Sequence, residues 1–153
     1  MLVGTTNLLE ALPAPGRARL MAFALDVSFP AGERITEEGG QADRFWVIRT
    51  GSVRLDLRVG MRPSAVVETL SPGDLIGWDW LFPPYEWHLG AETLSPVRAL
   101  EFDAEAARAL CDEDPLLGRA ITQRVAEIVA HRLQRTRTRL LELYGPHALG
   151  VPA

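Results

Sequence analysis

The middle of the chain alternates short apolar runs with turn-forming residues. Residues 45–49 form a mostly apolar run, which is typical of a strand buried on both faces. In residues 53–58, apolar and charged side chains alternate strictly, as they do in a strand with one buried face. Residues 65–70, 87–94 and 97–102 continue the series. Short strands at this spacing, separated by glycine and proline, predict a β-sandwich or barrel.

A helical pattern replaces the strands after residue 103. Asp114 and Pro115 are residue types preferred at the N-cap and at the first position of a helix. Six apolar side chains then recur at helical spacing along one stripe: Ile121, Val125, Val129, Leu133, Leu140 and Leu143. We expect one helix of about 28 residues, about 40 Å long, that ends at Gly145 and Pro146.

This helix is longer than the β domain beside it. Part of its apolar stripe therefore lacks a partner within the chain, and a second copy of the chain is the simplest one. The sequence accordingly predicts a homodimer in which the six stripe residues form the interface.

The pattern divides one domain into consecutive segments. Residues 1–25 are expected to be an N-terminal helical segment, residues 26–103 a β-roll, residues 104–145 the C-terminal helices and residues 146–153 a tail. A chain of 153 residues buries enough surface to be stable without disulfides or metals. The predicted fold class is therefore mainly β with flanking helices.

Composition limits the cellular location and the classes of partner that are expected. The net charge of −4 argues against a dedicated binder of duplex DNA, because phosphate neutralisation supplies most of the affinity of such proteins. No apolar run approaches the roughly 18 residues that span a bilayer, and no secretory signal is visible. The single cysteine, Cys111, cannot form an internal disulfide. These features predict a cytoplasmic protein.

Four short motifs, taken in order, resemble one known family. They are FPAGE at residues 29–33, DRFWVI at 43–48, GSV at 51–53 and LSPGDLIG at 70–77. They are similar to signatures of the cyclic nucleotide-binding domain in bacterial regulators typified by the cAMP receptor protein and the fumarate and nitrate reduction regulator. The resemblance implies a double-stranded β-helix (jelly roll), a phosphate-binding cassette at residues 77–86 and a role in signal transduction.

The cassette departs from the pattern of the family. In members that bind a cyclic nucleotide, a glutamate follows the cassette glycine, and an arginine some ten residues later pairs with the cyclic phosphate. Here Trp78 and Asp79 follow Gly77, and either Tyr85 or Glu86 stands at the place of the arginine. A carboxylate there repels a phosphate, so we do not expect cAMP or cGMP to bind in the usual way.

The expected ligand pocket combines the cassette with the long helix. Its residues are Gly77, Trp78, Asp79, Trp80, Tyr85, Glu86 and Trp87, together with Thr136 and Arg137. By resemblance, Thr136 stands where the helix of the family reaches a nucleotide base. True cyclic nucleotide binding stays open as a less favoured alternative, beside two interpretations of the aromatic side chains. The aromatic side chains either fill the roll, which leaves a structural protein-interaction module, or line a pocket recast for an aromatic or nucleotide-like ligand.

Other chemistry finds little support in the sequence. His88, His131 and His147 form no metal-ligand motif, which argues against a cupin-type metal enzyme, and neither a nucleophile elbow nor a P-loop occurs. After the expected end of the long helix only residues 146–153 remain, too few for the helix-turn-helix of the regulators. We therefore expect no enzyme, no cofactor and no DNA binding by this chain alone, but a homodimeric sensor that relays a signal to a protein partner.

Overall fold

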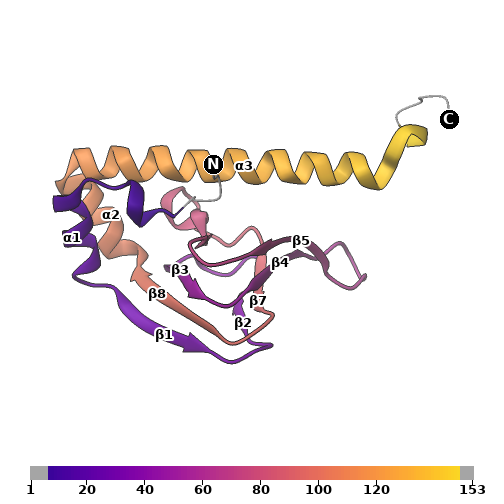
Figure 1. Ribbon diagram of the computed structural model, residues 1–153, viewed down its shortest axis with the longest axis horizontal. Helices are drawn as coiled ribbons and strands as arrows, with labels where there is room; N and C mark the ends of the chain where they lie inside the picture. Colours follow the sequence, from indigo (N-terminus) through magenta and orange to yellow (C-terminus); the bar gives the residue numbers. More distant parts are fainter. Residues whose placement is uncertain (1–6, 149–153) are drawn as a thin grey trace.

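Two four-stranded antiparallel sheets face each other in the computed structural model, which describes residues 7–148 (Figure 1). The first sheet has the order β1 (Leu25–Phe29), β8 (Val97–Asp103), β3 (Arg44–Thr50) and β6 (Leu75–Ile76). The second has the order β2 (Arg34–Thr36), β7 (Gly90–Thr93), β4 (Val53–Leu57) and β5 (Ala65–Leu70). This β-roll with flanking helices confirms the predicted fold class.

Helices cover the outer face of the first sheet. They are η1 (Leu9–Ala11), α1 (Ala14–Met21), α2 (Ala104–Glu113) and the long α3 (Pro115–Ala148), while η2 (Trp78–Leu81) lies between β6 and β7. Asp114 caps α3 as predicted, because its Oδ1 accepts a hydrogen bond of 3.2 Å from the amide of Leu117. Asp103 caps α2 in the same way, with the amide of Ala106 at 2.9 Å.

The far end of α3 differs from the expectation. Its helical backbone runs to Ala148, past the predicted stop at Gly145 and Pro146. Glycine permits a helix end but does not impose one, and proline prevents helix continuation mainly on its N-terminal side. Residues 1–6 of the predicted N-terminal segment and residues 149–153 of the predicted tail lie outside the described residues.

Strand β3 explains how the two layers hold together. Phe45 and Val47 point to the helices, whereas Trp46 and Ile48 point to the second sheet, so both faces of the strand are buried. The Phe45 ring lies between the rings of Trp80 and Phe102, with centroids 4.3 and 4.9 Å away. An apolar run without alternation is therefore what this strand requires.

The apolar stripe of α3 has two different environments. Ile121 and Val125 are fully buried against the helices and β-roll of the same chain, so they are not available to a second copy. Leu133, Leu140 and Leu143 are 68, 50 and 76% exposed. The six residues therefore do not form the single intermolecular ridge that the sequence predicts, because the first half of the stripe packs on its own domain. Val129, between the two halves, is half-buried.

A buried ion pair fixes the second sheet. Asp56 of β4 has no exposed surface and receives two hydrogen bonds from the guanidinium of Arg34, at 2.6 and 2.9 Å. The hydrogen bonds from Arg34 hold the pKa of Asp56 below its ordinary value. Gly90 of β7 lies directly beneath this pair, and a Cβ atom there would collide with both side chains. The buried ion pair between Arg34 and Asp56 therefore requires glycine at position 90.

We expect Asp56→Asn to lower the free energy of unfolding by about 2 kcal/mol at pH 7, because it leaves the Arg34 guanidinium without its buried charge partner. The native carboxylate has a pKa below its unfolded value of about 3.9, so its stabilisation is present above that pH and is lost as the pH falls through the folded pKa. Urea unfolding from pH 7 to pH 2 measures both effects. The matched control Asp26→Asn removes an exposed partner of Arg49 and should cost below about 0.5 kcal/mol; an equal loss in both variants would contradict the assignment.

Candidate functional site

A sharp turn separates β6 from the first residues of the cassette. Gly77 has φ of +93°, and a Cβ atom there would lie 2.5 Å from the ring of Trp87. Both the backbone conformation and the close approach of the indole therefore require glycine. After the turn, Trp78 and Asp79 line a space beneath the cassette together with Trp87 and Leu89, which belong to the segment before β7.

The space beneath the cassette is almost completely filled. Its walls are Thr36, Leu55, Ile76, Gly77, Trp78, Asp79, Trp87, Leu89 and Arg132. Its volume is about 20 Å³, room for about one water molecule. Pockets for small-molecule ligands usually measure a few hundred cubic ångströms or more. In this conformation, the space does not accommodate a nucleotide.

Asp79 is already satisfied by its own loop. Its side chain is 7% exposed, and Oδ2 accepts a hydrogen bond of 2.9 Å from the amide of His88 and lies 2.6 Å from His88 Nδ1. The ring of Trp78 stacks on the imidazole with centroids 5.0 Å apart. These contacts close the cassette on itself, which leaves Asp79 a structural role in the conformation observed.

Three expected pocket residues lie elsewhere. Trp80 is fully buried and stacks on Phe45, on the helix side of the first sheet. Tyr85 has φ of +58°, and the guanidinium carbon of Arg108 lies 4.1 Å from the centroid of its ring. Arg108 also donates a 2.6 Å hydrogen bond to the Trp80 carbonyl. Glu86 is exposed. The cassette is therefore clamped to α2 by Trp80 and Tyr85, neither of which lines the space beneath it.

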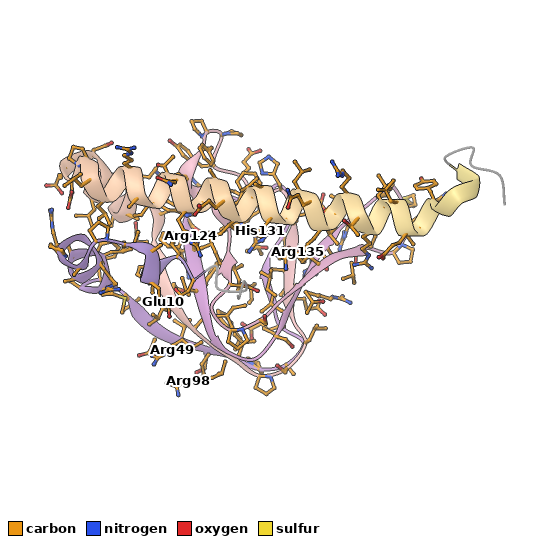
Figure 2. The ribbon with its side chains drawn as sticks, turned by 45° about the horizontal axis from the view of Figure 1, so that its top comes forward. Glu10, Arg49, Arg98, Arg124, His131 and Arg135 are labelled. Carbon is orange, nitrogen blue, oxygen red and sulfur yellow. The ribbon has the colours of Figure 1, made fainter. Side chains whose placement is uncertain are left out.

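An arginine of α3, not foreseen in the sequence, lines the space instead. Arg132 donates to the carbonyl of Leu75 at the end of the first sheet, and its Nε lies 3.4 Å from Glu68 Oε2 of β5. Arg135, on the flank of α3 shown in Figure 2, reaches the other oxygen of Glu68 at 2.8 Å. Burial raises the pKa of Glu68, and the positive charges of Arg135 and Arg132 counteract this shift. Burial also lowers the pKa of Arg132, and the negative charge of Glu68 counteracts that shift.

Thr136 and Arg137 do not join this cluster, because both side chains are exposed on α3. Arg132 could have been found by its spacing, since it follows Ile121, Val125 and Ile128 on the buried face of the helix. A charged side chain is normally expected on the exposed face of a helix. A long side chain can, however, bury its stem and still reach a carboxylate.

Residues 7–148 show neither a metal-ligand cluster nor a membrane-spanning helix. Within this part of the chain, no three histidine, cysteine, aspartate or glutamate side chains gather as the ligands of a metal ion would. The described helices include none whose length and apolarity would let it cross a bilayer.

Comparison with known families gives one match over most of the roll. A family described as "Cyclic nucleotide-binding domain" matches residues 26–114. A curated relative from Mycobacterium tuberculosis (strain ATCC 25618 / H37Rv), named CRP-like cAMP-activated global transcriptional regulator, is 29% identical over 117 residues. The alignment covers 76% of this chain and 50% of the relative, so this chain spans about half the length of the curated proteins that it matches.

Solved structures share the fold at low sequence identity. A putative cyclic nucleotide-binding protein from Geobacter metallireducens GS-15 has a TM-score of 0.73 at 23% identity and covers 86% of this chain and 99% of its own. A cyclic nucleotide-binding domain from Methylobacillus flagellatus KT has a TM-score of 0.79 at 15% identity, with 90% and 81% covered. The catabolite activator protein of Thermus thermophilus has a TM-score of 0.71 at 21% identity, with 90% and 62% covered.

We expect Arg132→Met to loosen the second half of α3, because Glu68 then keeps only the more exposed Arg135 and the Leu75 carbonyl loses its donor. Amide hydrogen exchange in residues 129–144 should become about tenfold faster, which corresponds to about 1.4 kcal/mol of local stability. The matched control Arg137→Met removes an exposed arginine from the same helix and should leave exchange unchanged. Equal exchange in the two variants would show that Arg132 does not hold the helix.

Proposed function

Because the chain belongs to the cyclic nucleotide-binding domain family, we propose that it is a regulatory module whose degenerate cassette does not take up cAMP or cGMP in the usual way. The observation that carries the proposal is the space of about 20 Å³ beneath the cassette. Trp78 and Trp87 occupy the volume that a ligand would need, and their removal would expose apolar surface to water.

The charges around the cassette support the same proposal. A cyclic phosphate needs a cation that is free to form charge-assisted hydrogen bonds. Among the residues that line the space, only Arg132 carries a positive charge, and its guanidinium is engaged by Glu68 and by the Leu75 carbonyl. A phosphate would therefore have to compete with a carboxylate that is already in place.

We propose that the second half of α3 joins two copies of the chain. The helix has 34 residues, about 51 Å at 1.5 Å per residue, and Figure 1 shows it extending past the β-roll. Apart from Leu116 in the first turn, the large exposed apolar side chains among the described residues of α3 lie in this part: Leu133, Leu140, Leu141, Leu143 and Tyr144. Pairing of two such helices would remove these side chains from water, and a change in the roll could then reach a partner protein through the paired helices.

Three finer points belong to the proposal. The module itself makes no specific contact with DNA, which its net charge of −4 supports. It works as a regulator without catalysing a reaction, as the regulatory family to which it belongs suggests. It resides in the cytoplasm, which is supported by a single cysteine that has no partner for an internal disulfide.

The alternative is a purely structural interaction module that binds no ligand. The filled space beneath the cassette supports this alternative as well as it supports the regulatory module. The two functions differ in whether any ligand reopens the roll. Trp78 and Trp87 line the closed space, so ligand entry would change their environment and their fluorescence. A structural module predicts constant fluorescence when the small-molecule fraction of a cell extract is added.

A second candidate, true cyclic nucleotide binding, is favoured by one observation. Arg132 already points into the space beneath the cassette, so a cation is present even though the cassette itself lacks one. In this candidate the phosphate displaces Glu68 from Arg132, and the two tryptophans move aside. The exchange of one anion for another would leave the buried arginine paired throughout.

Calorimetric titration distinguishes the proposal from this second candidate. We expect no saturable heat with cAMP or cGMP, which corresponds to a Kd weaker than about 1 mM. Saturable binding that persists in Arg137→Met but disappears in Arg132→Met would instead establish the second candidate.

We expect Leu133→Asp combined with Leu140→Asp to convert a dimer into a monomer, because two carboxylates per chain would become buried between paired helices. Sedimentation velocity measures the change. The control is Leu116→Asp, also on α3 and 75% exposed but located in the first turn, which should leave the dimer intact. A monomeric wild-type chain at high micromolar concentration would refute the proposed pairing.

A further inference from the structure

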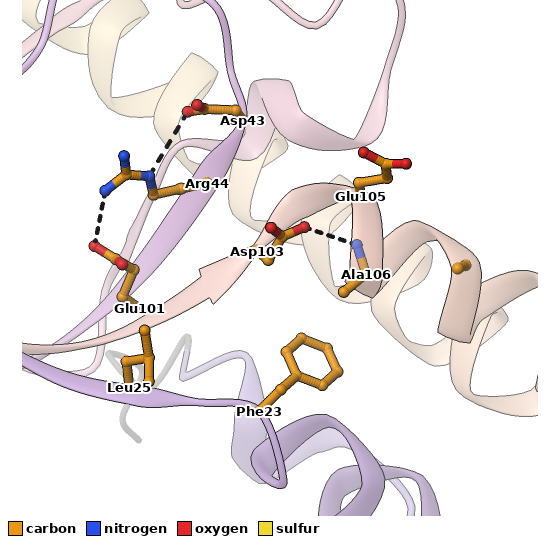
Figure 3. A pocket seen from close by; sticks show the side chains of 9 residues that line it. Phe23, Leu25, Asp43, Arg44, Glu101, Asp103, Glu105 and Ala106 are labelled. Carbon is orange, nitrogen blue, oxygen red and sulfur yellow. Dashed lines mark hydrogen bonds and ion pairs between the residues drawn. The ribbon is translucent and has the colours of Figure 1, made fainter.

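A second, much larger hollow lies away from the cassette. Figure 3 shows it at the end of the first sheet, where β1, β3 and β8 meet the start of α2. Its volume is about 720 Å³, and none of its lining residues belongs to the space beneath the cassette. The hollow, called the α2 groove below, is open to solvent and is not part of the function proposed above.

The floor of the α2 groove is apolar. Leu25 at the start of the edge strand β1 is 59% exposed, although it pairs with Glu101 of the neighbouring strand β8. Phe23 packs edge-on against Phe102 at 6.3 Å and turns the rest of its half-buried ring to the groove. Exposed alanines of α2, Ala106 and Ala109, form one wall. Such short side chains would let another backbone approach the helix closely.

The rim of the α2 groove is acidic. Its charged side chains are Asp43, Arg44, Glu101, Asp103 and Glu105, with a formal charge of −3. The guanidinium of Arg44 is already shared between Glu101 at 3.5 Å and Asp43 at 4.0 Å. Glu105 has neither a hydrogen bond nor an ion pair within the described part of the chain. Several carboxylate oxygens therefore remain available around an apolar floor.

We propose that the α2 groove is a docking surface for a cationic segment of a partner protein. Lysine or arginine side chains of that segment would meet Asp43, Asp103 and Glu105, and one apolar side chain would cover Leu25 and Phe23. Interfaces of this kind combine a small apolar centre with charges that steer the partner to it. The exposed apolar half of α3, proposed to bind a second copy, lies at the other end of the molecule (Figure 1), so both surfaces can be occupied together.

The test uses the full chain and a defined probe. The probe is an amphipathic 14-residue peptide of leucine and lysine at helical spacing, and its counterpart has glutamate in place of every lysine. Two-dimensional amide NMR should show shifts confined to residues 23–25, 43–44 and 101–109 with the lysine peptide, weakening as salt is added, and none with the glutamate peptide. Shifts spread over the whole surface, shifts with both peptides, or no shifts would each overturn the proposal.

Substitutions separate the groove from general electrostatic attraction. Glu105→Lys should weaken binding of the lysine peptide about tenfold, since it reverses an unpaired charge on the rim. Glu113→Lys changes the same charge on the same helix, at an exposed position outside the groove, and should have a several-fold smaller effect. Equal losses in the two variants would overturn the proposal. Thermal unfolding of both variants, together with the position of their unaffected amide signals, establishes that each remains folded.

Discussion

The burial of β3 on both faces is the constraint on which the rest of the structure depends. Phe45 on one face holds Trp80 of the cassette in a stack of three rings, which fixes the cassette against the helices. On the other face, the ring centroid of Trp46 lies 5.9 Å from that of Trp87, whose side chain fills the interior of the roll. Aromatic side chains thus hold the cassette from outside and fill the roll from inside. The closed space beneath the cassette follows from the packing of the core.

Much of the fold could be predicted from the sequence because its signals are local. Glycines such as Gly51 and Gly77 mark turns with positive φ, an apolar run predicted β3, and strict alternation of apolar and charged side chains predicted β4. The helical stripe of α3 was visible too, but periodicity states only which side chains share a face. It cannot tell whether that face meets the same chain, as at Ile121, or solvent, as at Leu133.

The candidate site was harder to predict because it combines distant segments. Trp78, Asp79 and Trp87 were expected in one pocket, and they do line one space. Trp80 was expected there as well, but the 3₁₀ turn of η2 places its ring on the opposite side of the cassette. Arg132 lies on α3, more than 40 residues after Trp87, and only tertiary packing brings it beneath the cassette.

The attachment of α3 has a mechanical consequence. Arg132 is the last largely buried side chain of α3 up to Tyr144, and the roughly 16 Å of helix between it and Leu143 behave as a stiff rod. A tilt of about 5° at this fulcrum would swing the Leu143 end by about 1.5 Å, as far as the helix shifts that switch other assemblies. Because Arg132 also donates to the carbonyl of Leu75 in β6, two residues before the cassette begins at Gly77, a small rearrangement in the roll would be amplified with distance along the rod.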